Sequence, residues 1–201
     1  MKMKGLLVGL LTCVGATANA TTITFNNTAL EGSAAAVGAS YSEAGYTMSN
    51  DTGTNYFVDN NYMSPDILAF DDDVLEFNSL GSQVTFTADN ASAFDFISVY
   101  LGGLNSSYGD AQLSFEGLFA AGGSIVEVID TFSDTYDFHT FAGFTNLTSL
   151  IVSAPVDGYF PVMDDFTFVT STPVPEPASL ALFGLGIAGM AFTRRKRKTN
   201  S

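Results

Sequence analysis

Short runs of alternating apolar and polar residues recur along this chain, and each run is bounded by Gly, Asn, Asp or Ser. A period of two places every second side chain on the same face, as in a β-strand with one buried and one wet face. Between residues 21 and 172 no segment shows a sustained helical stripe. We therefore expect an all-β chain whose antiparallel strands pack as a β-sandwich. The alternating runs lie at 23–25, 83–87, 94–101, 113–116, 125–129, 147–152 and 166–169.

The segment 21–172 has the length of one ordinary domain, about 150 residues, which is enough to bury a core. Two stretches rich in Ala, Gly and Ser, at 32–40 and 120–124, are too short to be linkers and are interpreted as loops. No internal repeat of fixed period is found in this segment. We therefore expect a single β-sandwich domain over residues 21–172.

Residues 1–20 contain the parts of a secretory signal peptide in the required order. Lys2 and Lys4 give a basic start, an apolar stretch follows at 6–11, and 18–20 reads Ala-Asn-Ala, a cleavage site with small residues. A short buried helix, the alternative, does not account for that order. We expect signal peptidase to cut after this site and the rest of the chain to be exported.

The predicted mature chain begins at Thr21 and contains no thiol. Cys13 is the one cysteine of the chain and leaves with the signal peptide. Disulfides, thiolate catalysis and cysteine-bound zinc or iron–sulfur centres are therefore excluded by composition.

The C-terminal segment has three successive parts: a Pro-rich linker at 173–177, an apolar span at 178–193 and a basic tail at 194–201. As a helix rising about 1.5 Å per residue, the apolar span reaches about 23 Å, short of the ~30 Å hydrocarbon core of a membrane. The basic tail would stop translocation and stay in the cytoplasm. These parts indicate a sorting signal, with an ordinary tail anchor as the alternative. The stop-transfer residues are Arg194, Arg195, Lys196, Arg197 and Lys198.

Val174, Pro175, Glu176 and Pro177, followed by the apolar span and the Arg-rich end, resemble the PEP-CTERM sorting signal. The resemblance implies processing by exosortase, a membrane cysteine transpeptidase of Gram-negative bacteria that secrete exopolysaccharide. It also implies transient insertion in the inner membrane, followed by display at the cell surface or in the extracellular matrix. We expect the secreted form to end near residues 175–177.

Positive charge is confined to the two ends of the chain. The 7 Lys and Arg residues lie at the termini, whereas the 21 Asp and Glu residues lie between Glu31 and Glu176. The formal net charge of −14 therefore understates the charge of the body, which has about twenty carboxylates and no internal Lys or Arg. Such a body is not expected to bind nucleic acid. Its carboxylates are interpreted either as a solvated face or as ligands of an oxygen-preferring cation.

The run 163–168, Met-Asp-Asp-Phe-Thr-Phe, resembles the closing strand of carbohydrate-binding jelly rolls. Segments 41–46 and 94–99 resemble strands of secreted PEP-CTERM proteins. The first resemblance implies a jelly-roll body with a structural calcium, held by the aspartate pair and by groups from the first strand and its loop. A solvated turn at the aspartate pair is the alternative. The expected calcium ligands are Asp164, Asp165, Asn26, Asn27 and Glu31.

Groups suited to catalysis are sparse. His139 is the one imidazole and lies in an apolar strand-like run, where we expect a satisfied core or surface histidine. No nucleophile-elbow motif accompanies it, which disfavours a Ser-His-Asp triad. Glycosidase chemistry by paired carboxylates stays open, although the body has no Trp, Lys or Arg to hold a sugar.

Sugar binding without chemistry makes smaller demands, because tyrosine rings beside Asn and Asp can act as stacking platforms. The candidate ligand-binding residues are Tyr56, Tyr62 and Tyr108. Structural tyrosines that fill half-buried strand positions are the alternative.

Three hypotheses of function follow. The first is a non-enzymatic exported protein that associates with exopolysaccharide. The second is a glycosidase or lyase that acts on that polymer. The third is a purely structural or adhesive surface protein.

Overall fold

The computed structural model describes residues 19–26, 33–52, 55–59, 73–78, 81–103, 111–132, 135–154 and 160–170. The chain divides into two compact units, Met1–Ser171 and Thr172–Ser201, and every described residue belongs to the first. The regular elements in these ranges are β-strands, which confirms the predicted all-β class, while the predicted C-terminal helix lies outside them. The strands are β1 (Ala20–Ile23), β2 (Ala34–Ala36), β3 (Ser40–Glu43), β4 (Tyr46–Thr52), β5 (Asn55–Val58), β6 (Val74–Phe77), β7 (Gln83–Ala88), β8 (Phe94–Gly103), β9 (Ala111–Phe119), β10 (Ser124–Thr131), β11 (Tyr136–Thr140), β12 (Leu147–Ser153) and β13 (Pro161–Thr170).

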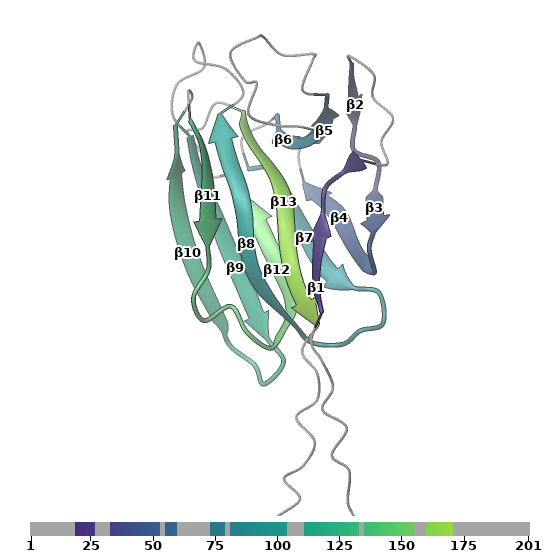
Figure 1. Ribbon diagram of the computed structural model, residues 1–201, viewed down its shortest axis with the longest axis vertical. Helices are drawn as coiled ribbons and strands as arrows, with labels where there is room; N and C mark the ends of the chain where they lie inside the picture. Colours follow the sequence, from purple (N-terminus) through teal and green to yellow (C-terminus); the bar gives the residue numbers. More distant parts are fainter. Residues whose placement is uncertain are drawn as a thin grey trace, which may run out of the picture. The chain divides into compact units, whose positions relative to one another are not determined.

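The strands form two antiparallel layers (Figure 1). In the front layer β13 pairs with β1 and β8, and β8 pairs with β11. In the rear layer β12 pairs with β7 and β9, and β9 pairs with β10. One residue pair, Leu147 with Phe94, links β12 to β8 and so joins the two layers. This arrangement confirms the predicted β-sandwich.

The order of these strands is that of a jelly roll. Counted along the chain, the eight strands β1, β7, β8, β9, β10, β11, β12 and β13 form two interleaved Greek keys, and successive strands change layer except at the β9–β10 hairpin. The front layer reads first, eighth, third, sixth, and the rear layer reads second, seventh, fourth, fifth. The strand pairing thus confirms the predicted jelly-roll body.

Strands β2 to β6 are inserted between the first and second strands of this jelly roll. β6, β5 and β2 extend the front layer, because β6 pairs with β13 and β5 pairs with both β6 and β2. β4 and β3 extend the rear layer beside β7. β1 and β6 therefore share one edge of β13, with β1 along 166–169 and β6 along 162–163.

Segment 41–46, which resembled a strand, is a hairpin that joins β3 to β4. Ala44 and Gly45 form its turn, with φ angles of 54° and 87°. Two successive positive φ angles are typical of the turn that matches the twist of a two-residue hairpin. The strand periodicity is therefore broken in the middle of this segment.

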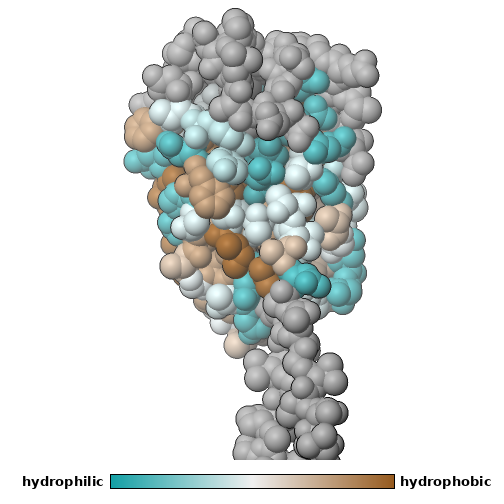
Figure 2. Space-filling view, viewed as in Figure 1, coloured by the Kyte–Doolittle hydropathy of each residue, from teal (hydrophilic) through white to brown (hydrophobic). Residues whose placement is uncertain are grey.

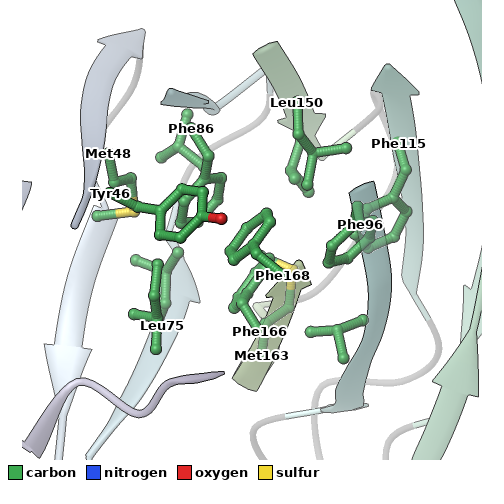
Figure 3. Packing of buried hydrophobic residues seen from close by; sticks show 14 of the residues in the cluster. Tyr46, Met48, Leu75, Phe86, Phe96, Phe115, Leu150, Met163, Phe166 and Phe168 are labelled. Atoms are coloured by element: carbon green, nitrogen blue, oxygen red, sulfur yellow. The ribbon is translucent and has the colours of Figure 1, made fainter. Parts of the chain in front are cut away.

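Apolar side chains fill the space between the layers, whereas the outward surface seen in Figure 2 is mostly pale or hydrophilic in colour. Rings dominate this core, as Figure 3 shows, and several contacts run directly from one layer to the other. Each fully buried Phe contributes roughly 1.5–3 kcal/mol of transfer free energy. The ring pairs that join the layers include Tyr46–Phe168, Phe86–Phe166 and Phe96–Phe115, with centroids 4.5, 4.6 and 6.0 Å apart.

Candidate functional site

The outer face of the front layer combines exposed rings with hydroxyl groups. Val99 and Leu101 of β8 and Met163 of β13 belong to the core, so the neighbouring side chains of Tyr100 and Asp164 point outward. Register places Phe138 of β11 opposite Tyr100 of β8, and Tyr100 opposite Asp164 of β13. These side chains therefore form one row across three strands.

Three rings at the β8–β11 side of this face form a group that we call the aromatic strip: Tyr100, Tyr136 and Phe138. The rings of Tyr100 and Tyr136 stack with centroids 4.7 Å apart, and Phe138 lies 4.9 Å from Tyr100 at a tilt of 53°. Phe138 is 55% exposed, and Ile97 on β8 is 39% exposed. Figure 2 shows brown, hydrophobic surface among paler surface on the face that is turned to the viewer. The strip gives the molecule an apolar contact surface open to solvent.

A line of hydroxyl groups, which we call the hydroxyl ladder, crosses the face next to the aromatic strip. Thr140, Ser98, Thr167 and Thr22 are successive register partners on β11, β8, β13 and β1. The Oγ1 atoms of Thr22 and Thr167 lie 3.2 Å apart and share a hydrogen bond. Hydroxyls both donate and accept, and Ser98 is buried, so the hydroxyls of Thr140, Thr167 and Thr22 are those that can pair with the hydroxyl groups of a ligand.

The carboxylates in these rows are withdrawn from solvent. Glu76, opposite Val162 on β13, is 2% exposed, and Asp164 is 4% exposed. Burial raises the pKa of Glu76, and a hydrogen bond donated by Asn78 Nδ2 to Glu76 Oε1, 2.7 Å long, opposes the shift. The solvent-facing part of the strip and ladder is therefore uncharged, in contrast to the acidic composition of the body.

The aspartate pair lies inside β13, at a β-bulge. Asp164 pairs with Tyr100 and Thr167 pairs with Ser98, so β13 contains one residue more than β8 between these two pairs. Asp165 has a φ of 52°, and its N–H donates to Asp164 Oδ1 at 2.7 Å. The sequence predicted either calcium ligands or a solvated turn at this pair, and the structure places the pair at an irregularity within a paired strand.

The structure tests the calcium ligands only in part. Asn26 follows the end of β1 and is exposed, whereas Asn27 and Glu31 lie outside the described residues. Within the described ranges, no group of three or more His, Cys, Asp or Glu side chains is arranged to hold a metal ion. The calcium site stays a prediction.

Of the three candidate tyrosines, Tyr56 can be placed. It lies on β5 opposite Glu76 and packs against the small apolar cluster of Val58, Val74 and Val162. Tyr62 and Tyr108 lie outside the described residues. The sequence reasoning missed Tyr136 and Phe138 as binding candidates, although the alternation of Tyr136, Phe138 and Thr140 marks the outward side of β11.

His139 occupies the inward side of β11, as expected of a satisfied histidine. Its Nε2 lies 3.0 Å from Glu127 Oε1 on β10, so this contact connects the front and rear layers at the open edge of the sandwich. The ring also packs 5.0 Å from that of Phe141. Its observed partners give His139 a structural role.

The predicted sorting residues, from Val174 to Lys198, lie outside the described part of the structure. In that part no helix is long and apolar enough to cross a membrane. Residues 173–198 match the family model of the PEP-CTERM protein-sorting motif. This chain carries a PEP-CTERM sorting motif. The motif confirms the resemblance drawn from residues 174–177 and implies an exported protein that exosortase sorts.

Solved structures with a similar overall arrangement include several carbohydrate-binding modules. TmCBM61 in complex with β-1,4-galactotriose is 12% identical with a TM-score of 0.43, over 63% of this chain and 88% of that chain. A family 29 module from Piromyces equi, CBM29_1, is 10% identical with a TM-score of 0.43, over 83% and 99% of the two chains. A mutant of CBM29-2 complexed with mannohexaose is 14% identical with a TM-score of 0.41, over 77% and 94%. A search of curated protein sequences gives no match to this chain.

Proposed function

We propose that this protein is a non-enzymatic exported protein that associates with exopolysaccharide through the outer face of its front layer. The observation that carries the proposal is the combination of the aromatic strip with the hydroxyl ladder, beside the buried carboxylates of Glu76 and Asp164. After signal peptidase and exosortase have acted, the body would stay at the cell surface or in the extracellular matrix.

The chemistry of the face favours a neutral glycan. Sugar rings have apolar C–H faces that pack on aromatic side chains, and their hydroxyls pair with Ser and Thr hydroxyls. An anionic polymer would be repelled by a body with about twenty carboxylates and no internal cation. A neutral chain that lies along β11 and β8 meets the rings first and the hydroxyls next.

Binding is favoured over catalysis because of where the carboxylates lie. A glycosidase needs two carboxyl groups about 5–10 Å apart, flanking the bond that breaks. On this face Glu76 and Asp164 are buried, and His139 points inward to Glu127. A glycosidase or lyase is therefore the less favoured function.

A calcium ion at the β13 bulge is a separate part of the proposal. Asp164 is 4% exposed and accepts a hydrogen bond from Asp165 N–H, and a bound cation would offset the remaining cost of burying its charge. Carboxylate and amide oxygens at Asp164, Asp165 and Asn26 suit calcium, with Asn27 and Glu31 as the further ligands expected from the sequence. The ion would fix the bulge and so the position of Tyr100 beside it.

Binding by the secreted, processed protein to the producer's own exopolysaccharide tests the proposal, measured by affinity electrophoresis or calorimetry. We expect Phe138→Ala to weaken binding about five- to tenfold, because it removes the most exposed ring of the strip. Phe132→Ala is the matched control, since Phe132 is a similarly exposed phenylalanine, at 48%, outside the strip. Equal binding by the two variants would overturn the assignment of this face.

The same samples separate the alternatives. Reducing ends that accumulate with time would establish an enzyme, and their loss in a single Asp→Asn or Glu→Gln variant would locate the catalytic group. Absence of any glycan binding, together with altered cell aggregation on deletion of the protein, would favour the purely structural or adhesive function.

A further inference from the structure

β10 is an edge strand with an unusual composition for that position. In the described part of the structure it pairs with β9 alone, and Figure 1 shows it at the margin of the rear layer. Edge strands present unpaired N–H and C=O groups and are commonly blunted by charged side chains such as Lys, by Pro or by a bulge, and in β10 Glu127 and Asp130 are the charged residues. β10 reads Ser-Ile-Val-Glu-Val-Ile-Asp-Thr and contains no Lys or Pro, and its pairing with β9 has an unbroken register.

The hairpin that precedes β10 shows which of its backbone groups face the free edge. Phe119 N–H donates to Gly123 C=O at 3.0 Å, so this is a hydrogen-bonded pair. Hydrogen-bonded and non-bonded pairs alternate along an antiparallel ladder, so Ile125, Glu127 and Ile129 bond to β9. The free-edge groups then belong to the other residues, which are all exposed: Ser124, Val126, Val128 and Asp130.

The sequence of β10 is its own mirror about Glu127. Residues 125–129 read Ile-Val-Glu-Val-Ile in both directions. If a second copy pairs antiparallel about a two-fold axis at Glu127, Val126 lies opposite Val128 of that copy, with both backbones in hydrogen-bonding orientation. The β10 residues whose backbone groups face the free edge and the palindromic sequence therefore indicate the same register.

We propose that β10 is an interface for a second copy of this chain, which extends the rear layer across a two-fold axis at Glu127. The pairing packs Val126 against Val128 of the second copy and Val128 against Val126 of that copy, and so buries side chains that are 55% and 52% exposed. It also places Ser124 opposite Asp130 of the second copy, so that a hydroxyl donor meets a carboxylate acceptor. No pairing between two exposed aspartates results from this register.

The centre of the interface brings the two Glu127 side chains together, which opposes association. Glu127 Oε1 of each copy stays 3.0 Å from His139 Nε2 of the same copy, so two imidazoles lie beside the two carboxylates. The surface that the pairing of one edge strand buries is also smaller than the ~1,600 Å² of a standard stable interface. The dimer is therefore weak and concentration-dependent, and salt strengthens it by screening the acidic bodies.

The two-fold axis is perpendicular to the rear layer, so both front layers lie on the same side of the dimer and their outer faces stay free. The inference does not depend on what that face binds. It concerns self-association alone and is measured without any glycan.

Sedimentation equilibrium of the secreted protein over a concentration series, in high salt, tests the interface. We expect Val128→Pro to weaken the dimer by about tenfold or more, because it removes a free-edge N–H and leaves the ladder to β9 intact. Val128→Thr keeps that N–H and is the matched control. Ile97 is an exposed apolar residue on a central strand, so Ile97→Thr controls for nonspecific hydrophobic association and should leave the dimer unchanged.

Two further variants test the register. Glu127→Gln removes the opposed charges and should tighten the dimer, whereas Ser124→Asp sets a new carboxylate against Asp130 of the second copy and should weaken it. If Val128→Pro does not fold, Ser124→Asp decides the question. A protein that stays monomeric at all concentrations, even as Glu127→Gln, would overturn the proposal, as would equal dimerisation by Ser124→Asp and the wild type.

Discussion

Gly117 of β9 occupies a position in the core that has no room for a side chain. A Cβ at this position would lie 2.8 Å from Leu147 Cδ2 and 3.0 Å from both Leu147 Cδ1 and Phe144 Cδ1. Leu147 and Phe144 are 0% and 1% exposed, so neither can move away without disturbing its own packing. Gly117→Ala is therefore an overpacking substitution.

The expected cost follows from two opposing effects. Overpacking costs about 1–3 kcal/mol, while alanine lowers the entropy of the unfolded chain and returns about 0.4–1 kcal/mol. We expect a net loss of about 1–2 kcal/mol in the free energy of unfolding, which lowers the Tm by roughly 2–8 °C. Thermal and urea unfolding of the secreted protein, followed by circular dichroism, measures both quantities.

Two variants make this prediction specific to the contact. Gly38→Ala is the control, because nothing lies within 4 Å of a Cβ at that position. Leu147→Val shortens the side chain that the new methyl group meets, so the double variant should lose at least about 0.5 kcal/mol less than the sum of the single variants. Strict additivity, or a Gly117→Ala protein as stable as Gly38→Ala, would show that the new methyl group does not collide with Leu147.

Three further perturbations test the carboxylates of the body. Millimolar calcium should raise the Tm of the secreted protein, and a chelator should lower it at constant ionic strength. Asp164→Asn should lose most of this difference. An equal effect of sodium would show that salt only screens the repulsion between carboxylates. Burial raises the pKa of Glu76 above its ordinary value of 4.5, so the folded state loses stability as the pH rises from 4.5 through the raised pKa. Glu76→Gln should therefore stabilise the protein at neutral pH and give no gain below about pH 4, and a gain that is the same at both pH values in urea unfolding would contradict this. Glu43 Oε2 accepts hydrogen bonds from Phe25 N–H at 3.0 Å and from the Tyr41 hydroxyl at 2.9 Å. Glu43→Ala should therefore lower the free energy of unfolding by about 1–3 kcal/mol. An unchanged midpoint of urea unfolding would contradict this prediction.

The sequence predicted several of the strands whose two faces differ, although it missed β4, which also alternates. Runs 83–87, 94–101, 125–129 and 147–152 all fall within strands, because each has one face in the core and the other toward solvent. β5 and β6 were missed for the opposite reason. Their burial patterns are nearly continuous, and the Val-Leu-Glu-Phe of β6 is buried on both faces, so no alternation marks it.

The candidate site depended on long-range register, which a sequence pattern does not specify. Tyr100 was visible as a tyrosine in a strand, but its contact with Phe138 exists only because β11 pairs with β8 in one register. The bulge at Asp164 and Asp165 was also hidden. Aspartate tolerates a positive φ, so the same two letters suit a turn, a metal site or an irregular strand.

β13 is the strand through which the sorting segment joins the body, and it has neighbours on both edges: β8 along one, and β1 and β6 along the other. A pull on the chain beyond Thr170 in the direction of β13 would load this strand lengthwise. The hydrogen bonds on both edges then carry the load in shear and must break together, whereas a strand peeled sideways from a sheet edge loses them one at a time. The strand order of the jelly roll therefore also gives the tethered end of the protein its mechanical strength.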